Sequence, residues 1–413
     1  MEQYVMKNQK RLRCGITTGT CAAAAAKAAA GALLVGLLEE TVTILTPKGI
    51  AVPIPVRLVG RGADWTEYEV EKDSGDDPDV TNHARIRVCV ERMEKAEPPA
   101  KAFFEPEYPG LYLDGGEGVG RVTRAGLEQE PGQAAINRVP RQMIFQAVEA
   151  IRSLTEDAGR LLIRVKVPEG ERLAARTFNP KLGILGGISI LGSSGILEPM
   201  SEKALVDTIE AEIRQLHVLG VRQLLVMPGN YGRAYAQEAL GLDLEGSVKC
   251  SNYVGETLDL AAAYGMESFF LVGNIGKLVK LAAGIMNTHS RVADGRGEIL
   301  ALHALLCGAD RKLAEGILSC VNTEEMLMLL DKKGLRGAVM SSLCGRIQEQ
   351  LEKRVQGRMR CGAALFSEKY GCLGLTPQAA ELLAEYRAHM GTAQQPGVVR
   401  AGTDEEKGGA QKE

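Results

Sequence analysis

Hydrophobic and polar positions alternate along residues 85–90, where the apolar side chains are Ile86, Val88 and Val90. A period of two indicates a half-buried strand. Further β-prone runs lie at residues 41–45, 52–59 and 68–70. They follow an alanine-rich run at residues 17–38 that predicts a helix. One helix followed by alternating strands predicts an α+β domain, which we place at residues 1–150.

The pattern changes after residue 150, where apolar strand-like runs alternate with amphipathic helical runs. The strand-like runs are residues 161–167, 184–191, 224–227 and 269–272, and the helical runs are residues 201–219, 232–240, 254–264 and 275–285. Near-continuous apolar strands between helices predict a three-layer α/β domain with a mostly parallel sheet. Residues 298–357 are helical in pattern throughout. We therefore assign this domain to residues 151–376, with a helical extension in its C-terminal part.

Two segments lack a periodic pattern. Residues 114–139 are rich in glycine and irregular, and a loop of that length is either functional or disordered. Residues 391–413 are rich in Gly, Gln, Glu and Lys, which predicts a disordered tail.

Composition narrows the functional classes. The net charge is −3 and aromatic residues make up 4% of the 413 residues, so neither a basic field nor a base-stacking surface is indicated. The nine cysteines form no C-x-x-C pair, which favours reduced thiols. Lys27 interrupts the alanine run, which is too weakly apolar to span a bilayer. We expect a cytoplasmic protein without nucleic-acid or membrane partners.

Glycine-containing loops follow three of the apolar strand runs, at residues 192–195, 228–232 and 273–277. In an open parallel sheet such loops share the edge where ligands bind. Glycine lets backbone N–H groups approach a ligand, although it also serves simple turns. None of the loops fits a Walker A or G-x-G-x-x-G motif. The candidate cofactor-binding residues are Gly192, Ser193, Ser194, Gly229, Asn230, Gly273 and Asn274.

Residues 287–296 form the densest polar run of the chain, between two apolar helical runs. His289 with Asp294 can act as an oriented base or bind a carboxylate, and arginine binds carboxylates bidentately. A capped turn with solvated arginines is the alternative. The candidate catalytic residues here are His289 and Asp294, and the candidate substrate-binding residues are Lys277, Asn287, Thr288, Ser290, Arg291 and Arg296.

Three segments of the first domain are weaker candidates. The acidic turn at residues 72–79 lacks EF-hand spacing, so we predict no metal site and keep Asp76 as a third catalytic candidate. Arg121 flanks the glycine-rich loop, which forms either an anion nest or a flexible loop. Thr18 and Thr20 offer hydroxyls to a substrate at a helix start, where capping explains them equally well.

Several long runs together resemble the CbiD family, the cobalt-precorrin-5B C(1)-methyltransferases. These runs are residues 15–27, 75–81, 115–123, 179–192, 228–232, 251–256 and 284–294. The resemblance covers about residues 11–376. The Asn82-His83-Ala84 segment departs from it, which weakens any direct role for His83.

The resemblance implies a two-domain S-adenosylmethionine-dependent methyltransferase. Its substrate would be cobalt-precorrin-5B, methylated at ring carbon C-1 to give cobalt-precorrin-6A in cobalamin biosynthesis. Cobalt would arrive only as part of this corrinoid substrate. The oligomeric state, and any transient contact with neighbouring pathway enzymes, stay open.

The sequence leaves two alternative functions open. One is a corrinoid-binding protein without catalysis, which would not consume S-adenosylmethionine. The other is a phosphotransferase that uses the helix start at residues 17–20 and the loop at residues 115–120, against which the missing Walker A pattern counts.

Overall fold

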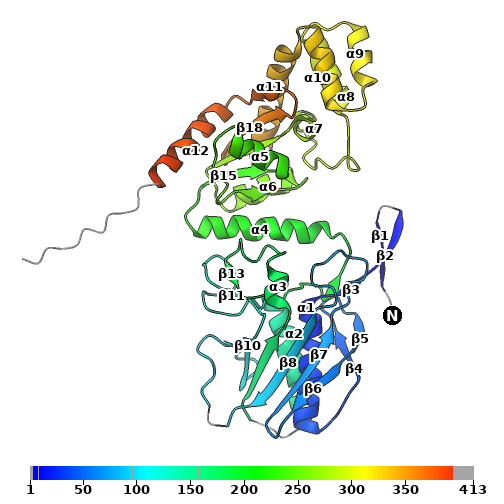
Figure 1. Ribbon diagram of the computed structural model, residues 1–413, viewed down its shortest axis with the longest axis vertical. Coiled ribbons are helices and arrows are strands. Elements are labelled where there is room, and N and C mark those ends of the chain that lie inside the picture. Colours follow the sequence, from blue (N-terminus) through cyan, green and yellow to red (C-terminus); the bar gives the residue numbers. More distant parts are fainter. Residues whose placement is uncertain (1–2, 8, 95, 156–158, 394–413) are drawn as a thin grey trace, which may run out of the picture. The chain divides into compact units, whose positions relative to one another are not determined.

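The chain forms two units in the computed structural model, which describes residues 3–7, 9–94, 96–155 and 159–393 (Figure 1). Unit 1 is Met1–Gly220 and unit 2 is Val221–Glu413. Each unit has its own hydrophobic core. The division after Gly220 contradicts the predicted boundary after residue 150.

A six-stranded mixed sheet, in the order β6-β7-β8-β12-β10-β9, is the frame of unit 1. Its strands are β6 (Arg57–Arg61), β7 (Trp65–Glu71), β8 (Arg85–Arg92), β9 (Phe103–Phe104), β10 (Leu111–Gly115) and β12 (Leu161–Lys166). Strand β12 runs antiparallel to β8 and parallel to β10. Helix α2 (Arg138–Arg152) is the crossover that such a parallel pair needs. The predicted boundary failed because it cuts this crossover.

Helix α1 (Thr18–Ala30) continues as the π-turn η1 (Gly31–Val35) and packs between the sheet and α2. Its alanines are buried, and their small side chains allow the close approach of α2 and the sheet. The segment Thr18–Val35 is long and apolar enough to cross a membrane, but 72% of it is buried inside the unit. It is the core helix of unit 1.

The alternation at residues 85–90 is confirmed in β8. Its apolar positions belong to the core beside α1, whereas its arginines lie on the other face of the sheet. There Arg87 binds Glu69 of β7 at 2.8 Å, and Arg57 binds the same carboxylate. Lys166 of β12 binds Glu67 at 2.7 Å. Charge pairs between strands thus cover the polar face.

Shorter elements complete unit 1. They are β1 (Tyr4–Lys7) with β2 (Lys10–Arg13), β3 (Gly15–Ile16) with β14 (Ile196–Leu197), β4 (Thr41–Leu45) with β5 (Ala51–Pro55), β11 (Arg121–Val122) with β13 (Ile184–Leu185), and the helices α3 (Gly170–Ala174) and α4 (Glu202–Val218). The runs at residues 161–167 and 184–191 were assigned to the second domain. Both lie in unit 1 because they pair with its strands.

A five-stranded sheet, in the order β16-β15-β17-β18-β19, is the frame of unit 2. Its strands are β15 (Gln223–Met227), β16 (Val248–Lys249), β17 (Ser268–Asn274), β18 (Arg360–Ser367) and β19 (Gly371–Leu375). The first four in spatial order are parallel, and β19 is antiparallel to β18. This sheet agrees with the predicted mostly parallel α/β architecture. Strands β18 and β19 were not predicted.

Helices pack on this sheet, and further helices extend beyond it (Figure 1). They are α5 (Asn230–Glu238), α6 (Val254–Ala263), α7 (Ile275–Leu278) continued by the 3-10 turn η2 (Val279–Ala283), α8 (Arg296–Leu306), α9 (Arg311–Leu318), α10 (Thr323–Lys332), α11 (Arg336–Val355) and α12 (Ala379–Ala393). Helices α5 and α12 share one core with the sheet, and α11 packs on β18 and α6. Helices α8–α11 confirm the predicted helical extension. Most of the predicted tail, residues 394–413, lies outside the described residues, and α12 includes its first three residues.

Candidate functional site

The carboxyl edge of the unit 2 sheet is where the topology predicts a ligand. In chain order the parallel strands are β15, β16, β17 and β18, whereas in space their order is β16-β15-β17-β18. The chain therefore leaves β15 toward one side of the sheet and leaves β17 toward the other. Open α/β sheets bind ligands at the carboxyl ends of the strands at such a switch point. Here it lies between the loops that follow β15 and β17.

These two loops carry four of the predicted cofactor-binding residues. Gly229 and Asn230 follow β15 directly, and the space around Gly229 is open. Gly273 is buried within β17, and Asn274 ends that strand. The side-chain carbonyl of Asn274 accepts the N–H of Gly276 at 2.8 Å as the N-cap of α7. This cap directs the carbonyl inward and leaves the side-chain amide group as a donor.

Lys277 follows that cap, and its side chain is half-buried. Burial lowers the pKa of its ammonium, and the charges of Lys249 and Lys280 act in the same direction. Among the described residues, no carboxylate pairs with this ammonium. A desolvated charge without a counter-ion at a sheet edge is a candidate ligand-binding group.

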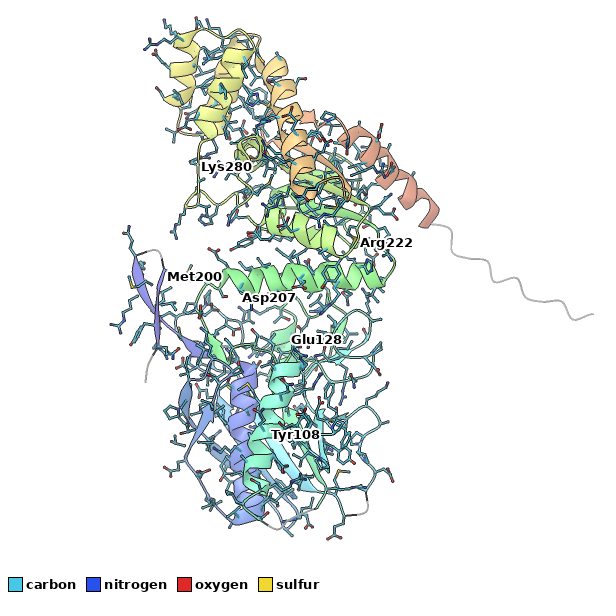
Figure 2. The ribbon with its side chains drawn as sticks, turned by 180° about the vertical axis from the view of Figure 1, so that it is seen from behind. Tyr108, Glu128, Met200, Asp207, Arg222 and Lys280 are labelled. Atoms are coloured by element: carbon cyan, nitrogen blue, oxygen red, sulfur yellow. The ribbon has the colours of Figure 1, made fainter. Side chains whose placement is uncertain are left out.

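The polar run at residues 287–296 is fixed beside the loop that follows β16. Thr288 is buried, and its N–H donates to the carbonyl of Asn252 at 2.9 Å. Lys280, labelled in Figure 2, is 2% exposed and donates to the carbonyls of Thr288 and Ala293 at 3.2 and 2.8 Å. Lys280 therefore holds the loop from inside, so it does not present its charge to a ligand.

The two predicted catalytic residues of this run have separate partners. Asp294 accepts two hydrogen bonds from the guanidinium of Arg296, at 2.6 and 2.8 Å, which hold the pKa of Asp294 below its ordinary value. His289 Nδ1 accepts the N–H of Arg291 at 3.1 Å. The neutral ring then carries its proton on Nε2. His289 is thus arranged to donate a hydrogen bond to a ligand, and the Asp294–Arg296 ion pair replaces the expected His289–Asp294 pair.

The other residues of the run differ in their availability. Asn287 accepts the N–H of His289 at 3.1 Å, and Ser290 and Arg291 are exposed. No described carboxylate pairs with Arg291, whereas Asp294 neutralises Arg296. Arg291 therefore remains a candidate for binding a carboxylate, and Arg296 does not.

The third predicted loop, residues 192–195, lies in unit 1 and packs on the start of α1. Thr18 Oγ1 donates to the carbonyl of Leu191 at 3.2 Å and accepts its N–H at 2.9 Å. Thr20 Oγ1 donates to the carbonyl of Gly195 at 2.7 Å. Both threonines are buried. Their hydroxyls join two segments of the fold, which favours a structural role over substrate binding and over the phosphotransferase's helix-start site.

The loop residues themselves also serve the fold. Gly192 has a φ of +132°, and a Cβ there would meet Thr17 Oγ1 at 2.4 Å. Ser194 Oγ donates to the carbonyl of Ile196 at 2.7 Å, and Ser193 is exposed. The prediction that all three loops share one sheet edge is therefore wrong, because this one belongs to unit 1.

Arg121 is held within the glycine-rich loop at residues 114–139. It donates to both carboxylate oxygens of Asp114, at 2.7 and 3.0 Å. Gly118 has a φ of +68°, and a Cβ there would meet the carbonyl oxygen of Val167 at 1.8 Å. The glycines thus permit close backbone packing. The loop is a packed part of unit 1 and Asp114 already pairs with Arg121, which does not favour an anion nest or a substrate-binding role for Arg121.

Asp76 lies in the acidic turn, where it accepts the N–H of Arg13 at 2.6 Å. The turn is organised around Lys72, which is 1% exposed. Its ammonium donates to Asp79 Oδ2 and Ser74 Oγ, each at 2.6 Å. A buried cation of the chain therefore orders these carboxylates. Asp76 is exposed and tied to Arg13, which does not favour a catalytic role.

Metal-binding side chains do not gather anywhere in the described part of the chain. No group of three or more His, Cys, Asp or Glu residues there is placed to hold an ion. All nine cysteines, which are all described, are free thiols.

Sequence reasoning missed two charged residues near the switch point. Lys249 donates to Asn230 Oδ1 at 3.0 Å. Glu256, in the first turn of α6, has a buried Oε2 without a hydrogen-bond partner among the described residues. Strand β16 has only two residues, so no periodic pattern marks the turn that brings Lys249 there.

A cavity of about 650 Å³ in unit 2 lies away from this edge. Its lining includes Glu267 and Arg360, which precede β17 and begin β18, at the amino ends of those strands. None of the predicted site residues lines it.

Unit 2 is thus a doubly wound α/β domain whose polar loops gather where this class of protein binds its ligands. The sequence matches the family described as CbiD over residues 5–199 and the family described as CbiD, C-terminal domain, over residues 287–377. This chain belongs to the CbiD family.

Relatives cover nearly the whole chain. A cobalt-precorrin-5B C(1)-methyltransferase of Ruminiclostridium cellulolyticum is 44% identical over 368 residues, which are 89% of this chain and 92% of the relative. One of Alkaliphilus metalliredigens is 41% identical and covers 93% of this chain and 97% of the relative. A crystal structure of the cobalamin biosynthesis protein from Archaeoglobus fulgidus is 28% identical, over 71% of this chain and 88% of that chain, with a TM-score of 0.37.

Proposed function

We propose that this chain is an S-adenosylmethionine-dependent methyltransferase that methylates cobalt-precorrin-5B at C-1, giving cobalt-precorrin-6A in cobalamin biosynthesis. The observation that carries the proposal is its 44% identity over 89% of its length to a relative named for this reaction. The corrinoid substrate supplies the cobalt. The cytoplasm is the proposed location.

Methyl transfer from S-adenosylmethionine mainly requires that the enzyme position the methyl donor and the acceptor carbon. S-adenosylmethionine supplies an activated methyl group on a sulfonium. The protein must hold that methyl in line with a nucleophilic ring carbon, and positioning of this kind accounts for about 7–11 kcal/mol of a barrier. A resident metal is not required. Alignment and exclusion of water are therefore the tasks of the chain's residues.

The switch-point loops fit a donor with an amino-acid end and a nucleoside end. The open backbone at Gly229 permits close approach, and Asn230 and Asn274 offer side-chain amides. For the corrinoid we assign His289, as a hydrogen-bond donor from Nε2, together with Arg291. In this arrangement Asp294 does not act as a base, because its carboxylate is paired with the guanidinium of Arg296.

The decisive test is anaerobic incubation of the protein with cobalt-precorrin-5B and methyl-labelled S-adenosylmethionine, followed by mass spectrometry of the corrinoid. We expect a gain of one labelled methyl group. Corrinoid binding without transfer would instead favour the non-catalytic corrinoid-binding protein.

The site assignment has its own test. His289→Ala and Asn287→Ala should lower turnover about tenfold or more, because each removes a hydrogen bond that orders the substrate or the loop. His289 is exposed, so its variant should unfold at the wild-type temperature. Normal turnover in both variants would exclude this loop from the site.

A further inference from the structure

The positive charge of Lys277 is not balanced by a carboxylate among the described residues of unit 2. The cations that act on its ammonium are Lys249 and Lys280, the other neighbouring group is the thiol of Cys250, and no described carboxylate is among them. Cys250 is fully buried, and burial raises the pKa of its thiol to about 12, so it stays neutral. A half-buried cation beside two further cations is stabilised by an anion from outside the protein.

Lys249 is held close by. Its ammonium donates to Asn230 Oδ1 at 3.0 Å, which brings the end of β16 to the end of β15. An amide oxygen is a neutral partner and leaves the positive charge uncompensated. The end of β15 leads into one of the two switch-point loops, and β16 is its neighbour in the sheet. Lys249 and Lys277 are therefore two cations on one sheet edge without a described carboxylate partner.

Lys280 does not belong to this pair as a binding group. Its ammonium is buried, donates to two backbone carbonyls and lies 4.0 Å from Asp294. Its charge contributes to the field at Lys277, but its hydrogen bonds are used within the protein. The cations that remain to bind a ligand are Lys249 and Lys277.

We propose that Lys249 and Lys277 together bind a carboxylate of the ligand at the switch point. The inference rests on the proposed function, in which two molecules offer this group. One is the methyl donor, through the carboxylate of its amino-acid end, and the other is the corrinoid, through a carboxylate of its ring substituents. The chemistry at the lysines is the same in both cases.

Matched probe pairs distinguish the two sources. For the donor, S-adenosylhomocysteine is compared with methylthioadenosine, which lacks the carboxylate. For the corrinoid, a stable cobalt corrinoid with free carboxylates is compared with its amidated counterpart. Calorimetric titration of the full chain gives the affinity for each probe. The variants are Lys249→Met and Lys277→Met, with the exposed Lys312→Met of α9 as control.

We expect each lysine variant to lose about tenfold or more in affinity for the carboxylate probe of one pair, because a charge-assisted hydrogen bond is lost. Affinity for the carboxylate-free member should not change, and neither should any affinity of Lys312→Met. The pair that responds identifies the source. Lys277→Met should unfold at or above the wild-type temperature, because it removes an unpaired half-buried charge.

Three results would overturn the inference: unchanged affinity for both carboxylate probes, equal losses for both members of a pair, or no binding of either pair by the wild type. Methyl transfer is assayed separately. Lysine-dependent carboxylate binding without methyl transfer would refute the proposed reaction and leave the carboxylate site standing.

Discussion

The described polar side chains of this protein fall into two groups, those with hydrogen-bond or ion-pair partners inside the fold and those without. Arg121, Thr18 and Thr20 are polar residues in conspicuous motifs, and each makes hydrogen bonds inside unit 1. Lys277 is the opposite case, because burial destabilises its charged form and no described carboxylate compensates for this. Whether a polar group has a partner within the protein therefore separates structural from functional groups better than its residue type does.

Lys72 supports the first residue-scale prediction. Lys72→Met leaves Asp79 without its cation and should lower the free energy of unfolding by about 3 kcal/mol, the lower end for a broken buried pair. Denaturant unfolding measures the loss. Lys48→Ala removes a partly exposed lysine from Glu198 and serves as control, with an expected change of at most about 1 kcal/mol. Equal losses of unfolding free energy in Lys72→Met and Lys48→Ala would mean that the buried Lys72–Asp79 pair is no more stabilising than an exposed pair.

The second residue-scale prediction concerns acid. Burial acts to raise the pKa of Glu69, Asp79 and Glu169, but their basic partners hold each pKa below its ordinary value, as the Arg13 hydrogen bond does for Asp73. Among the described carboxylates of unit 1, Asp77 and Asp207 have a pKa raised by burial. The depressed groups stabilise the fold fully above their unfolded pKa of about 4.

The stability of unit 1 should therefore fall as the pH drops below about 4, through the folded pKa of these carboxylates. Unfolding curves at successive pH values measure this decline. In Lys72→Met the decline should be shallower, because Asp79 no longer has a depressed pKa to lose. A stability that rises on acidification would contradict the assignment of these ion pairs.

At the scale of elements, α1 shows how composition sets packing distance. Ala25 is fully buried where α1 lies between α2 and the sheet. Ala25→Leu adds three carbons to a closed interface and should cost about 1–3 kcal/mol of unfolding free energy. Ala380→Leu, at an exposed position of α12, should change it by no more than about 0.5 kcal/mol. Chemical denaturation of both variants tests this, and a neutral Ala25→Leu would show that the interface can open.

At the scale of the whole molecule, the position of β12 decides which part of the chain can fold alone. It lies between β8 and β10, so a fragment that ends at residue 150 lacks a central strand. We expect residues 1–220 to unfold cooperatively when expressed alone and residues 1–150 to show no cooperative transition. Circular dichroism on heating tests both fragments. A cooperative 1–150 fragment would show that β12 is dispensable.

Elements that depend on neighbouring residues, and the family of the protein, could be predicted from the amino-acid sequence alone. The alternation in β8, the alanine-rich α1 and the helices α8–α11 follow from side-chain periodicity, which neighbouring residues impose without reference to distant ones. The long matching runs identified the CbiD family because many positions agree in order.

The pairing of distant segments, and which polar groups remain free to bind a ligand, could be seen only in the folded protein. Strand β12 joins unit 1 because it pairs with β8 and β10, a long-range choice that its apolar pattern does not encode. The loop at residues 192–195 lies in unit 1, apart from the other two glycine loops, because it leads into β14, which pairs with β3 of unit 1. Lys249 meets Asn230 through strand pairing, so its place beside Lys277 could not be read from spacing. Periodicity reports burial along one segment, whereas a binding site depends on which segments meet.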